Sequence, residues 1–213
     1  MKIGVLGGTF DPIHHGHLYI AKSAKHVFGL DQVLFVVSNY PPHKGPRSIS
    51  DAYHRYAMTA LALSESEDLL VSGVELTRSG LSYTIDTMTQ LKKKDPSGQL
   101  CFIAGSDSLG EIHLWKDYDK LFSRHSLVFI QRPGAEIALN RLDLLPEYRG
   151  LISEVGADDS TELSPGRSFL LNLAPPPISS TEVRNTFRSG GVPGDDVIHP
   201  LVSHYIRKHR LYL

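Results

Sequence analysis

The sequence feature that most constrains the fold lies at the start of the chain, where a short apolar run meets two glycines and then three histidines. Ile3–Leu6 contains β-branched residues and is followed at once by Gly7 and Gly8, which predicts a buried strand ending in a tight turn. Apolar residues then recur at helical spacing, so we expect a helix to begin within His14–His17. Unpaired amide groups and the helix dipole at such a turn favour an anion. With the histidines, the stretch predicts a phosphate-binding site.

The size and charge of the chain limit the classes of function. Its 213 residues suit a single domain over 1–213, and a formal net charge of −1 with no basic stripe argues against capture of nucleic acid. The single cysteine, Cys101, excludes an internal disulfide, and we expect it as a buried strand thiol. No apolar stretch approaches the roughly 20 residues of a membrane span, and the chain opens on a strand rather than a signal peptide. We therefore expect a cytoplasmic protein with no membrane partner.

Strands and helices alternate along the rest of the chain. A strand over Val33–Ser38 follows the first helix, and such a strand–helix–strand unit implies parallel strands. In the helix that should follow, the face with Tyr53 and Tyr56 is expected to pack in the core, while 132–167 should be irregular helix and loop. Further strands are predicted at 69–76, 99–104, 127–131 and 169–173, and further helices at 50–64, 81–91, 178–188 and 201–213. The alternation predicts an α/β fold with a doubly wound, mainly parallel sheet.

A proline-rich loop, Asn39–Arg47, follows the second predicted strand. Proline prevents the strand or a helix from continuing, and the loop carries His43, Lys44 and Arg47. Ligands in open α/β sheets bind beyond the carboxyl ends of the strands, so these cations could face the same crevice as the histidines. The alternative is a solvated surface loop.

Two further residues near a strand end have more than one interpretation. Asp107 comes directly after the strand at 99–104; it could accept bonds from sugar hydroxyls, hold a metal or cap a helix over 108–114. Trp115, the only tryptophan, could anchor the core or offer a stacking surface to a planar ring.

A second motif, ISSTEVR, lies near the end of the chain. Ser179 and Glu182 have the spacing of a capping box, which predicts the start of a helix. Ser180, Thr181 and Arg184 would then place two hydroxyls and a guanidinium on its first turn, as a second phosphate site requires. The alternative is simply a well-capped helix.

The histidine cluster admits three chemistries. His14 and His17 share one helix face and could stabilise charge on a polyphosphate. His15 and His17 form the H-x-H pair of metal-dependent amidohydrolases, but later strand ends lack matching histidines and that barrel needs a longer chain. The glycines do not form G-x-G-x-x-G, which disfavours hydride transfer with a dinucleotide. Since no activated nucleophile is evident, the substrates should supply the nucleophile and leaving group.

Five segments together resemble one enzyme family. GGTFDPIHHGH and ISSTEVR resemble the motifs of the nucleotidyltransferase superfamily with an HxGH active site, and specifically of the bacterial nicotinate-nucleotide adenylyltransferases. PPHK, SYTIDT and GSDSLGEIHLW lie between them in the family's order and spacing, so the resemblance covers essentially the whole chain. It implies a Rossmann-like nucleotidyltransferase fold with a small C-terminal helical portion.

The resemblance also implies roles for individual residues. His14, His17, Lys44 and Arg184 would be catalytic, with the two histidines binding ATP phosphates in the transition state. The residues implied to contact ATP and its phosphates are Gly7, Gly8, Thr9, Phe10, His43, Gly105, Asp107, Ser180 and Thr181.

The second substrate implied by the resemblance is nicotinate mononucleotide. Backbone amides near Thr84 would bind the nicotinate carboxylate and Trp115 would stack on the ring, with Lys116 next to it. Relatives often carry an aromatic residue at position 116; a contact through its backbone amide tolerates lysine, and an added cation would favour the acid over the amide.

The reaction implied is adenylyl transfer from ATP in NAD biosynthesis, with Mg²⁺ accompanying ATP and no metal site built from protein side chains. Two alternatives stay open. One is an adenylyltransferase acting on pantetheine phosphate, and the other is a non-catalytic nucleotide-binding regulator. The sequence does not choose between a monomer and a homo-oligomer.

Overall fold

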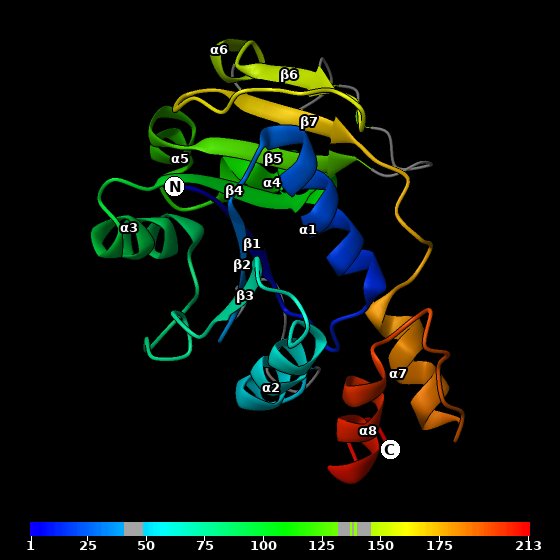
Figure 1. Cartoon of the computed structure of the whole chain (residues 1–213). Helices are drawn as coiled ribbons and strands as arrows, with labels where there is room; N and C mark the ends of the chain where they lie inside the picture. Colours follow the sequence, from blue (N-terminus) through cyan, green and yellow to red (C-terminus); the bar gives the residue numbers. More distant parts are fainter. Residues whose placement is uncertain (41–48, 132–136, 138, 140–145) are drawn as a thin grey trace.

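Seven apolar segments form one parallel sheet in the computed structural model, which describes residues 1–40, 49–131, 137, 139 and 146–213 (Figure 1). The strand order is β3-β2-β1-β4-β5-β7-β6, and every pairing between neighbours is parallel. The strands are β1 (Lys2–Gly8), β2 (Gln32–Val37), β3 (Leu69–Ser72), β4 (Gln99–Gly105), β5 (Ser126–Gln131), β6 (Ile152–Val155) and β7 (Ser168–Asn172). Because both faces of the sheet are covered, its central strands are nearly continuous apolar runs.

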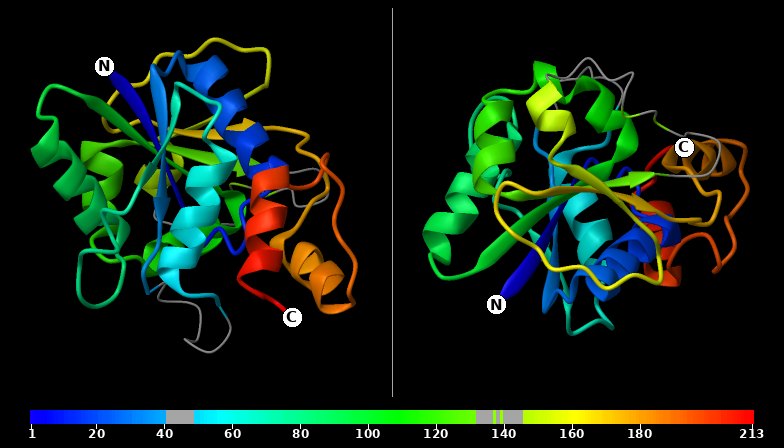
Figure 2. Two further views of the ribbon diagram at one scale, coloured as in Figure 1. Left: turned by 60° about the horizontal axis from the view of Figure 1, so that its bottom comes forward. Right: turned by 90° about the horizontal axis from the view of Figure 1, so that it is seen from above.

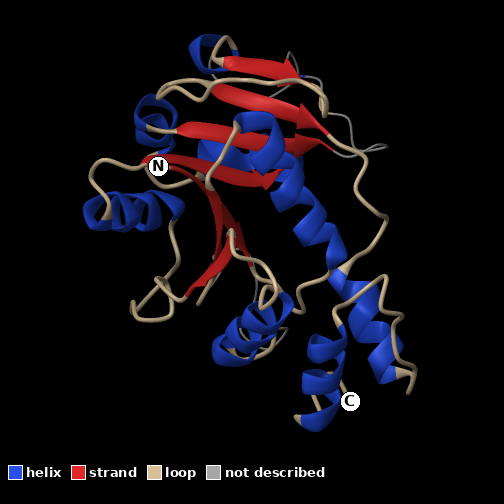
Figure 3. Ribbon diagram, in the orientation of Figure 1, coloured by secondary structure: helices blue, strands red, loops and turns tan. Residues whose placement is uncertain are grey.

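Helices cover both faces of this sheet (Figures 2 and 3). The core on one face includes Leu6 and Val128 and packs against α1, α2, α7 and α8, while the core on the other includes Val5 and Leu127 and packs against α3, α4 and α5. The helices are α1 (His15–Phe28), α2 (Ala52–Ala62), α3 (Thr84–Lys94), α4 (Ser106–Glu111), α5 (Tyr118–Arg124), α6 (Pro146–Arg149), α7 (Ser180–Arg188) and α8 (Pro200–Lys208), with a 3₁₀ turn η1 (Ile112–Leu114). The prediction of a doubly wound α/β fold is confirmed.

Three sequence predictions need correction. The third strand ends at Ser72 rather than at residue 76, and the segment over 132–167, expected to lack strands, contributes the edge strand β6. In α2 the expected core face is wrong for Tyr53, which is 69% exposed, and right for Tyr56, which packs against the core, while Arg55 is fully buried. The buried face follows the helical spacing Ala52, Arg55, Met58 and Ala62, with an arginine in the middle.

Other predictions agree with the structure. The capping box of Ser179 and Glu182 is present at the start of α7, and Cys101 is fully buried, which raises the pKa of its thiol to about 12. Among the described residues, no helix is long and apolar enough to cross a membrane.

The sheet order fixes where a ligand can bind. The connections run outward in opposite directions from β1 and β4, which are adjacent in the sheet. Helices that follow these two strands lie on opposite faces, and this leaves a crevice beyond their carboxyl ends.

Candidate active site

A cavity of about 450 Å³ occupies this crevice. It lies beyond β1 and β4 and reaches the first turns of α1, α3 and α4. Of the predicted site residues, those that line it are Gly7, Gly8, Thr9, Phe10, His17, Thr84, Gly105, Asp107 and Trp115. His14, Lys116, Ser180, Thr181 and Arg184 are described but do not line it, and His43 and Lys44 lie outside the described residues.

An aromatic ring covers the carboxyl end of β1. The sequence predicted a tight turn at Gly7 and Gly8, but both glycines belong to the strand and the chain leaves the sheet through Thr9–Pro12. Phe10 has a φ of 48°, in the left-handed region that few bulky residues adopt, and its ring lies directly over Gly8. A Cβ atom on Gly8 would approach the Phe10 ring to 2.6 Å, so only glycine fits there. The same ring meets the edge of His17, with 5.1 Å between ring centroids. Backbone strain at this point is typical of residues that shape a functional site.

His14 and His17 cap the first helix for each other. His14 occupies the N-cap of α1, and its amide donates a hydrogen bond of 3.2 Å to Nδ1 of His17. The two rings stack with 3.8 Å between their centroids, and His14 is almost fully buried. Because Nδ1 of His17 accepts a bond, the neutral ring carries its proton on Nε2, which makes that atom the donor.

The loop Thr9–Pro12 joins the end of β1 to these histidines, and side chains from distant helices donate hydrogen bonds to its backbone carbonyls. Arg55 donates to the carbonyl of Thr9 at 2.8 Å, and Arg184 donates to the carbonyl of Asp11. Ser180 donates to the carbonyl of Pro12 at 2.9 Å. Helices α2 and α7 therefore support this loop, although they lie far from it in the sequence.

Asp11 is the buried acid of the loop, with only 4% of its surface exposed. Its Oδ1 accepts a bond of 2.6 Å from the hydroxyl of Tyr212, and its Oδ2 accepts one of 3.2 Å from the amide of Ser50. Burial raises the pKa of Tyr212, and the neighbouring carboxylate of Asp11 raises it further. The phenol therefore stays protonated and acts as a donor.

Arg55 is the largest fully buried side chain. Besides Thr9, it donates to the carbonyls of Ser50 at 2.9 Å and Asn39 at 3.3 Å. Burial lowers the pKa of this guanidinium, and the charges of Asp11 and Asp51 oppose that change. Its three carbonyl partners come from three separate segments of the chain, so Arg55 ties the Thr9–Pro12 loop to Asn39 and Ser50.

The first turn of α7 makes contacts that limit its predicted phosphate role. Ser180 and Arg184 each direct a donor to the Thr9–Pro12 loop, and Arg184 also donates to Oγ1 of Thr181 at 3.1 Å. Part of the donor capacity expected for a triphosphate is therefore used to hold protein backbone.

Trp115 and the start of α3 form the other side of the cavity. Trp115 is half-buried and meets Phe102 edge-on, with 6.0 Å between the ring centroids. It packs on the core, as the first interpretation of this residue expected, and it also lines the cavity, as a stacking surface must. Thr84 is the first residue of α3, where the amides have no partner within the helix. Lys116 points elsewhere, because its Nζ lies 2.9 Å from Asp86 and 5.0 Å from the centre of the Tyr83 ring. The hydrogen bond to Asp86 raises the pKa of Lys116.

Three carboxylates line the cavity. Asp107 folds back over Gly105, and the helix that follows begins at Ser106 with Gly105 as N-cap, so Asp107 does not cap a helix over 108–114. Glu75 is nearly buried and accepts a bond of 2.6 Å from Thr87, while Glu111 is exposed. Within the described part of the chain, no three His, Cys, Asp or Glu side chains converge as a metal site.

Sequence reasoning missed four residues of this region: Asp11, Arg55, Glu75 and Tyr212. Arg55 could have been found, because an arginine on the apolar side of a helical pattern needs buried acceptors. Glu75 was hidden by the overlong third strand. Tyr212 carried no local signal, since its partner lies 201 residues earlier.

Comparison with known proteins agrees with this geometry. Residues 5–186 match the cytidylyltransferase-like family model. A "probable nicotinate-nucleotide adenylyltransferase" of Shewanella putrefaciens is 36% identical, with both chains covered completely, and one of Thermoanaerobacter sp. is 38% identical over 100% of this chain and 94% of its own.

A solved structure supports the fold. The Plasmodium falciparum nicotinic acid mononucleotide adenylyltransferase complexed with NaAD superimposes with a TM-score of 0.75, covering 99% of this chain and 97% of its own, at 23% identity. The motifs, the family model and the full-length relatives therefore agree: this chain belongs to the cytidylyltransferase-like family, among the nicotinate-nucleotide adenylyltransferases.

Proposed function

We propose that this chain transfers the adenylyl group of ATP to nicotinate mononucleotide, giving nicotinate adenine dinucleotide and pyrophosphate in NAD biosynthesis. The observation that carries the proposal is that a single cavity has two different sides. Gly7, Gly8 and His17 line one side, and Thr84 at the start of α3 lines the other side together with Trp115. The side with the glycines and the histidine suits the phosphates of ATP, and the side with Thr84 and Trp115 suits a flat ring that bears a carboxylate.

The reaction needs alignment and charge stabilisation more than proton transfer. A 5′-phosphate oxygen of nicotinate mononucleotide bonds to the α-phosphorus of ATP. The bond from that phosphorus to the oxygen bridging to the β-phosphate breaks, and pyrophosphate leaves with the electron pair. The attacking phosphate is already ionised at neutral pH, so no general base is required. Donors fixed before the reaction lower the barrier by stabilising charge as it moves to the leaving group.

Within this scheme, we assign the main donor role to His17. Its Nδ1 accepts a hydrogen bond from the amide of His14, so Nε2 carries the proton of the neutral ring, and we assign that N–H to phosphate oxygens. His14 fixes the ring by stacking on it, and we assign the ATP phosphates to the end of β1, where Gly7, Gly8 and Thr9 line the cavity. Arg184 and Ser180 contribute by holding the loop that leads to the histidines, and their remaining donor capacity is open to the triphosphate.

In this proposal, the side of the cavity at α3 and Trp115 binds the pyridine ring of nicotinate mononucleotide. We assign the nicotinate carboxylate to the amides at Thr84, the ring to Trp115, and the ribose region of a nucleotide to Gly105 and Asp107. Since Lys116 pairs with Asp86 and does not line the cavity, its side chain has no direct part, and any contact would be through its backbone.

Magnesium enters with ATP in this proposal. The described carboxylates Glu75, Asp107 and Glu111 do not converge, which fits an ion held mainly by phosphate oxygens and water. The ion would neutralise charge on the phosphates. We also place the protein in the cytoplasm, where its buried free thiol would stay reduced.

The deciding experiment measures pyrophosphate release with Mg-ATP and three separate acceptors: nicotinate mononucleotide, nicotinamide mononucleotide and pantetheine phosphate. Strong preference for the first supports the proposal. Preference for the amide would overturn the carboxylate site at Thr84, and preference for pantetheine phosphate would overturn the acceptor altogether. ATP binding without pyrophosphate release from any of them would favour a regulator.

A further inference from the structure

The segment after α8 reaches back to the start of the chain and contacts the loop that precedes the histidines. Tyr212 donates a hydrogen bond of 2.6 Å to Asp11, although the two residues are 201 positions apart. Asp11 has only 4% of its surface exposed, so this hydroxyl and the amide of Ser50 replace the water that its two oxygens would otherwise bind.

Tyr212 is held in an unfavourable backbone conformation to make this contact. Its φ is 66°, in the left-handed region where a bulky side chain is rare. Its ring packs beside Phe187 of α7, with 6.5 Å between the centroids, and its hydroxyl lies 4.0 Å from the sulfur of Met58 in α2. Such strain persists only where surrounding contacts enforce it, and it gathers at functional sites.

The contact lies one step from the proposed donors. Asp11 is three residues before His14, and the residue between Pro12 and His14, Ile13, is fully buried. A shift of Asp11 would therefore be transmitted to the N-cap of α1, where the amide of His14 sets the ring of His17. Besides Tyr212, the described groups that act on the side chain of Asp11 are the amide of Ser50, which donates a hydrogen bond, and the nearby charge of Arg55.

We propose that Tyr212 is a positioning residue for adenylyl transfer, which fixes Asp11 and through it the orientation of the histidines at the start of α1. The expected effect of Tyr212 on kcat rests on the proposed function, whereas its expected effect on the ring of His17 does not. Removing the hydroxyl leaves a buried carboxylate oxygen without its donor, and the loop must move or admit water to satisfy it.

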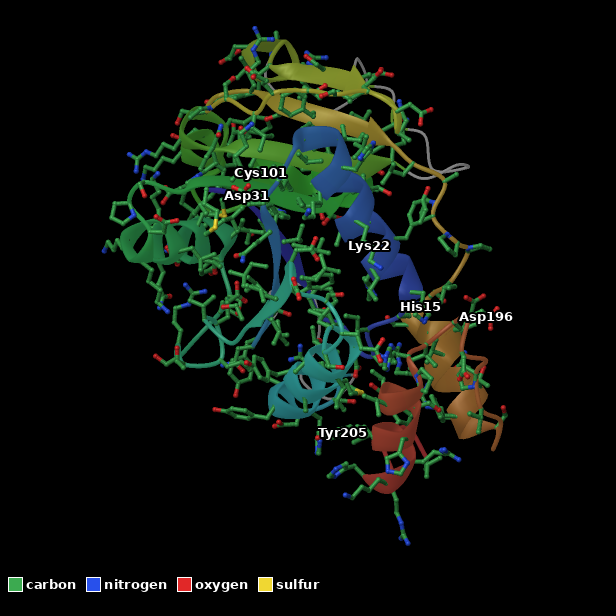
Figure 4. The ribbon with its side chains drawn as sticks, in the orientation of Figure 1. His15, Lys22, Asp31, Cys101, Asp196 and Tyr205 are labelled. Atoms are coloured by element: carbon green, nitrogen blue, oxygen red, sulfur yellow. The ribbon has the colours of Figure 1, made fainter. Side chains whose placement is uncertain are left out.

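The test compares Tyr212→Phe with a matched control, Tyr205→Phe. Tyr205 lies on the side of α8 that faces α2, and its hydroxyl bonds Nδ1 of His54 at 2.9 Å (Figure 4). Both variants remove one tyrosine hydroxyl that ties the end of the chain to the rest, but only Tyr212 contacts Asp11.

In fully folded samples, Tyr212→Phe should lower kcat about tenfold or more and change the two KM values by less than about threefold, because small misplacements at the reacting centre act on the transition state. Tyr205→Phe should keep kcat within about twofold. Asp11→Asn should resemble Tyr212→Phe, and the double variant should be no slower than the slower single variant. Equal kcat for wild type and Tyr212→Phe would overturn the proposal.

A second readout does not depend on turnover. In ¹⁵N-histidine NMR spectra, the ring nitrogens of His17 report whether Nδ1 is the acceptor and Nε2 is protonated. Tyr212→Phe should shift the signals of His17, whereas Tyr205→Phe should shift those of His54 and leave His17 unchanged. If the wild type released no pyrophosphate with any acceptor, the proposed function would fail while this measurement still decided the role of Tyr212. Unchanged His17 signals in Tyr212→Phe would reject that role.

Discussion

The two sides of the cavity are built differently. On the side of β1 and the histidines, the Thr9–Pro12 loop is held by the buried Arg55 and by two half-buried side chains from distant elements, Ser180 and Tyr212. On the side of α3, Trp115 is half-buried and edge-on to a single ring, and Lys116 forms an exposed ion pair with its neighbour Asp86.

This difference matches the two tasks of the site, which are to stabilise the transition state and to select the substrate. Stabilising the transition state requires donors fixed to within fractions of an ångström, and buried hydrogen bonds supply that rigidity. Selecting a substrate requires a complementary surface that admits and releases it, which tolerates a looser construction. We therefore expect substitutions on the β1 side to lower kcat or stability and those on the α3 side to change KM.

The largest effect is expected at the donor itself. His17→Ala should lower kcat by a factor that corresponds to about 2–4 kcal/mol of activation free energy, the scale of a lost charge-stabilising donor, and should leave the protein folded. Steady-state pyrophosphate release and a thermal melt check the two statements. Near-normal turnover would remove His17 from the mechanism.

The support beneath the loop comes next. Arg55→Met keeps the length of the side chain but leaves the carbonyls of Thr9, Ser50 and Asn39 without this donor, so the free energy of unfolding should fall by about 2–4 kcal/mol. Urea denaturation at pH 7 measures it. The control is Arg188→Met on α7, whose exposed arginine bonds only to nearby Asn185 in the described contacts and should cost less than about 0.5 kcal/mol. Similar losses in both variants would contradict the distinction.

On the α3 side, Trp115→Ala should raise the KM for nicotinate mononucleotide about three- to tenfold through lost stacking, with kcat nearly unchanged. The neighbouring Leu114, which is 70% exposed, provides the control in Leu114→Ala. A fall in kcat without a change in KM would show that the tryptophan belongs to the rigid side of the site.

The smallest effect is expected at Lys116. Lys116→Ala breaks an exposed ion pair outside the cavity lining, so the ratio of kcat/KM for the acid over the amide should change less than about twofold. Competition between nicotinate and nicotinamide mononucleotides measures this ratio. A tenfold loss of preference for the acid would mean that the cation reaches the carboxylate after all.

The sequence predicted what local patterns determine. Alternating apolar runs located six of the seven strands, and the glycines and histidines located one side of the cavity, although Gly7 and Gly8 belong to β1 rather than to a turn. The strand β6 was missed because its four residues carry too short a pattern beside an irregular segment. The resemblance implied a contact at position 116 through either the backbone amide or the side chain, and the structure directs the Lys116 side chain to Asp86, outside the cavity lining.

The supports of the site were harder to predict. Arg55 sits in a helix whose tyrosines looked more suited to the core, and only the fold shows that backbone carbonyls from three segments surround its guanidinium. The bond between Asp11 and Tyr212 depends on packing between the two ends of the sequence, and a single sequence has no pattern that relates them.

The bond between Asp11 and Tyr212 also bears on how the protein matures. Domains emerge from the ribosome from the amino end, so Asp11 is synthesised 201 residues before the hydroxyl that satisfies it. A nascent chain can pair β1 with β2 and β4 early, but the carboxylate of Asp11 has no hydrogen bond from Tyr212 until that residue has been synthesised. The loop that is first in synthesis would then be the last to become rigid, and the full rate of turnover would be reached only after residue 212 has been added.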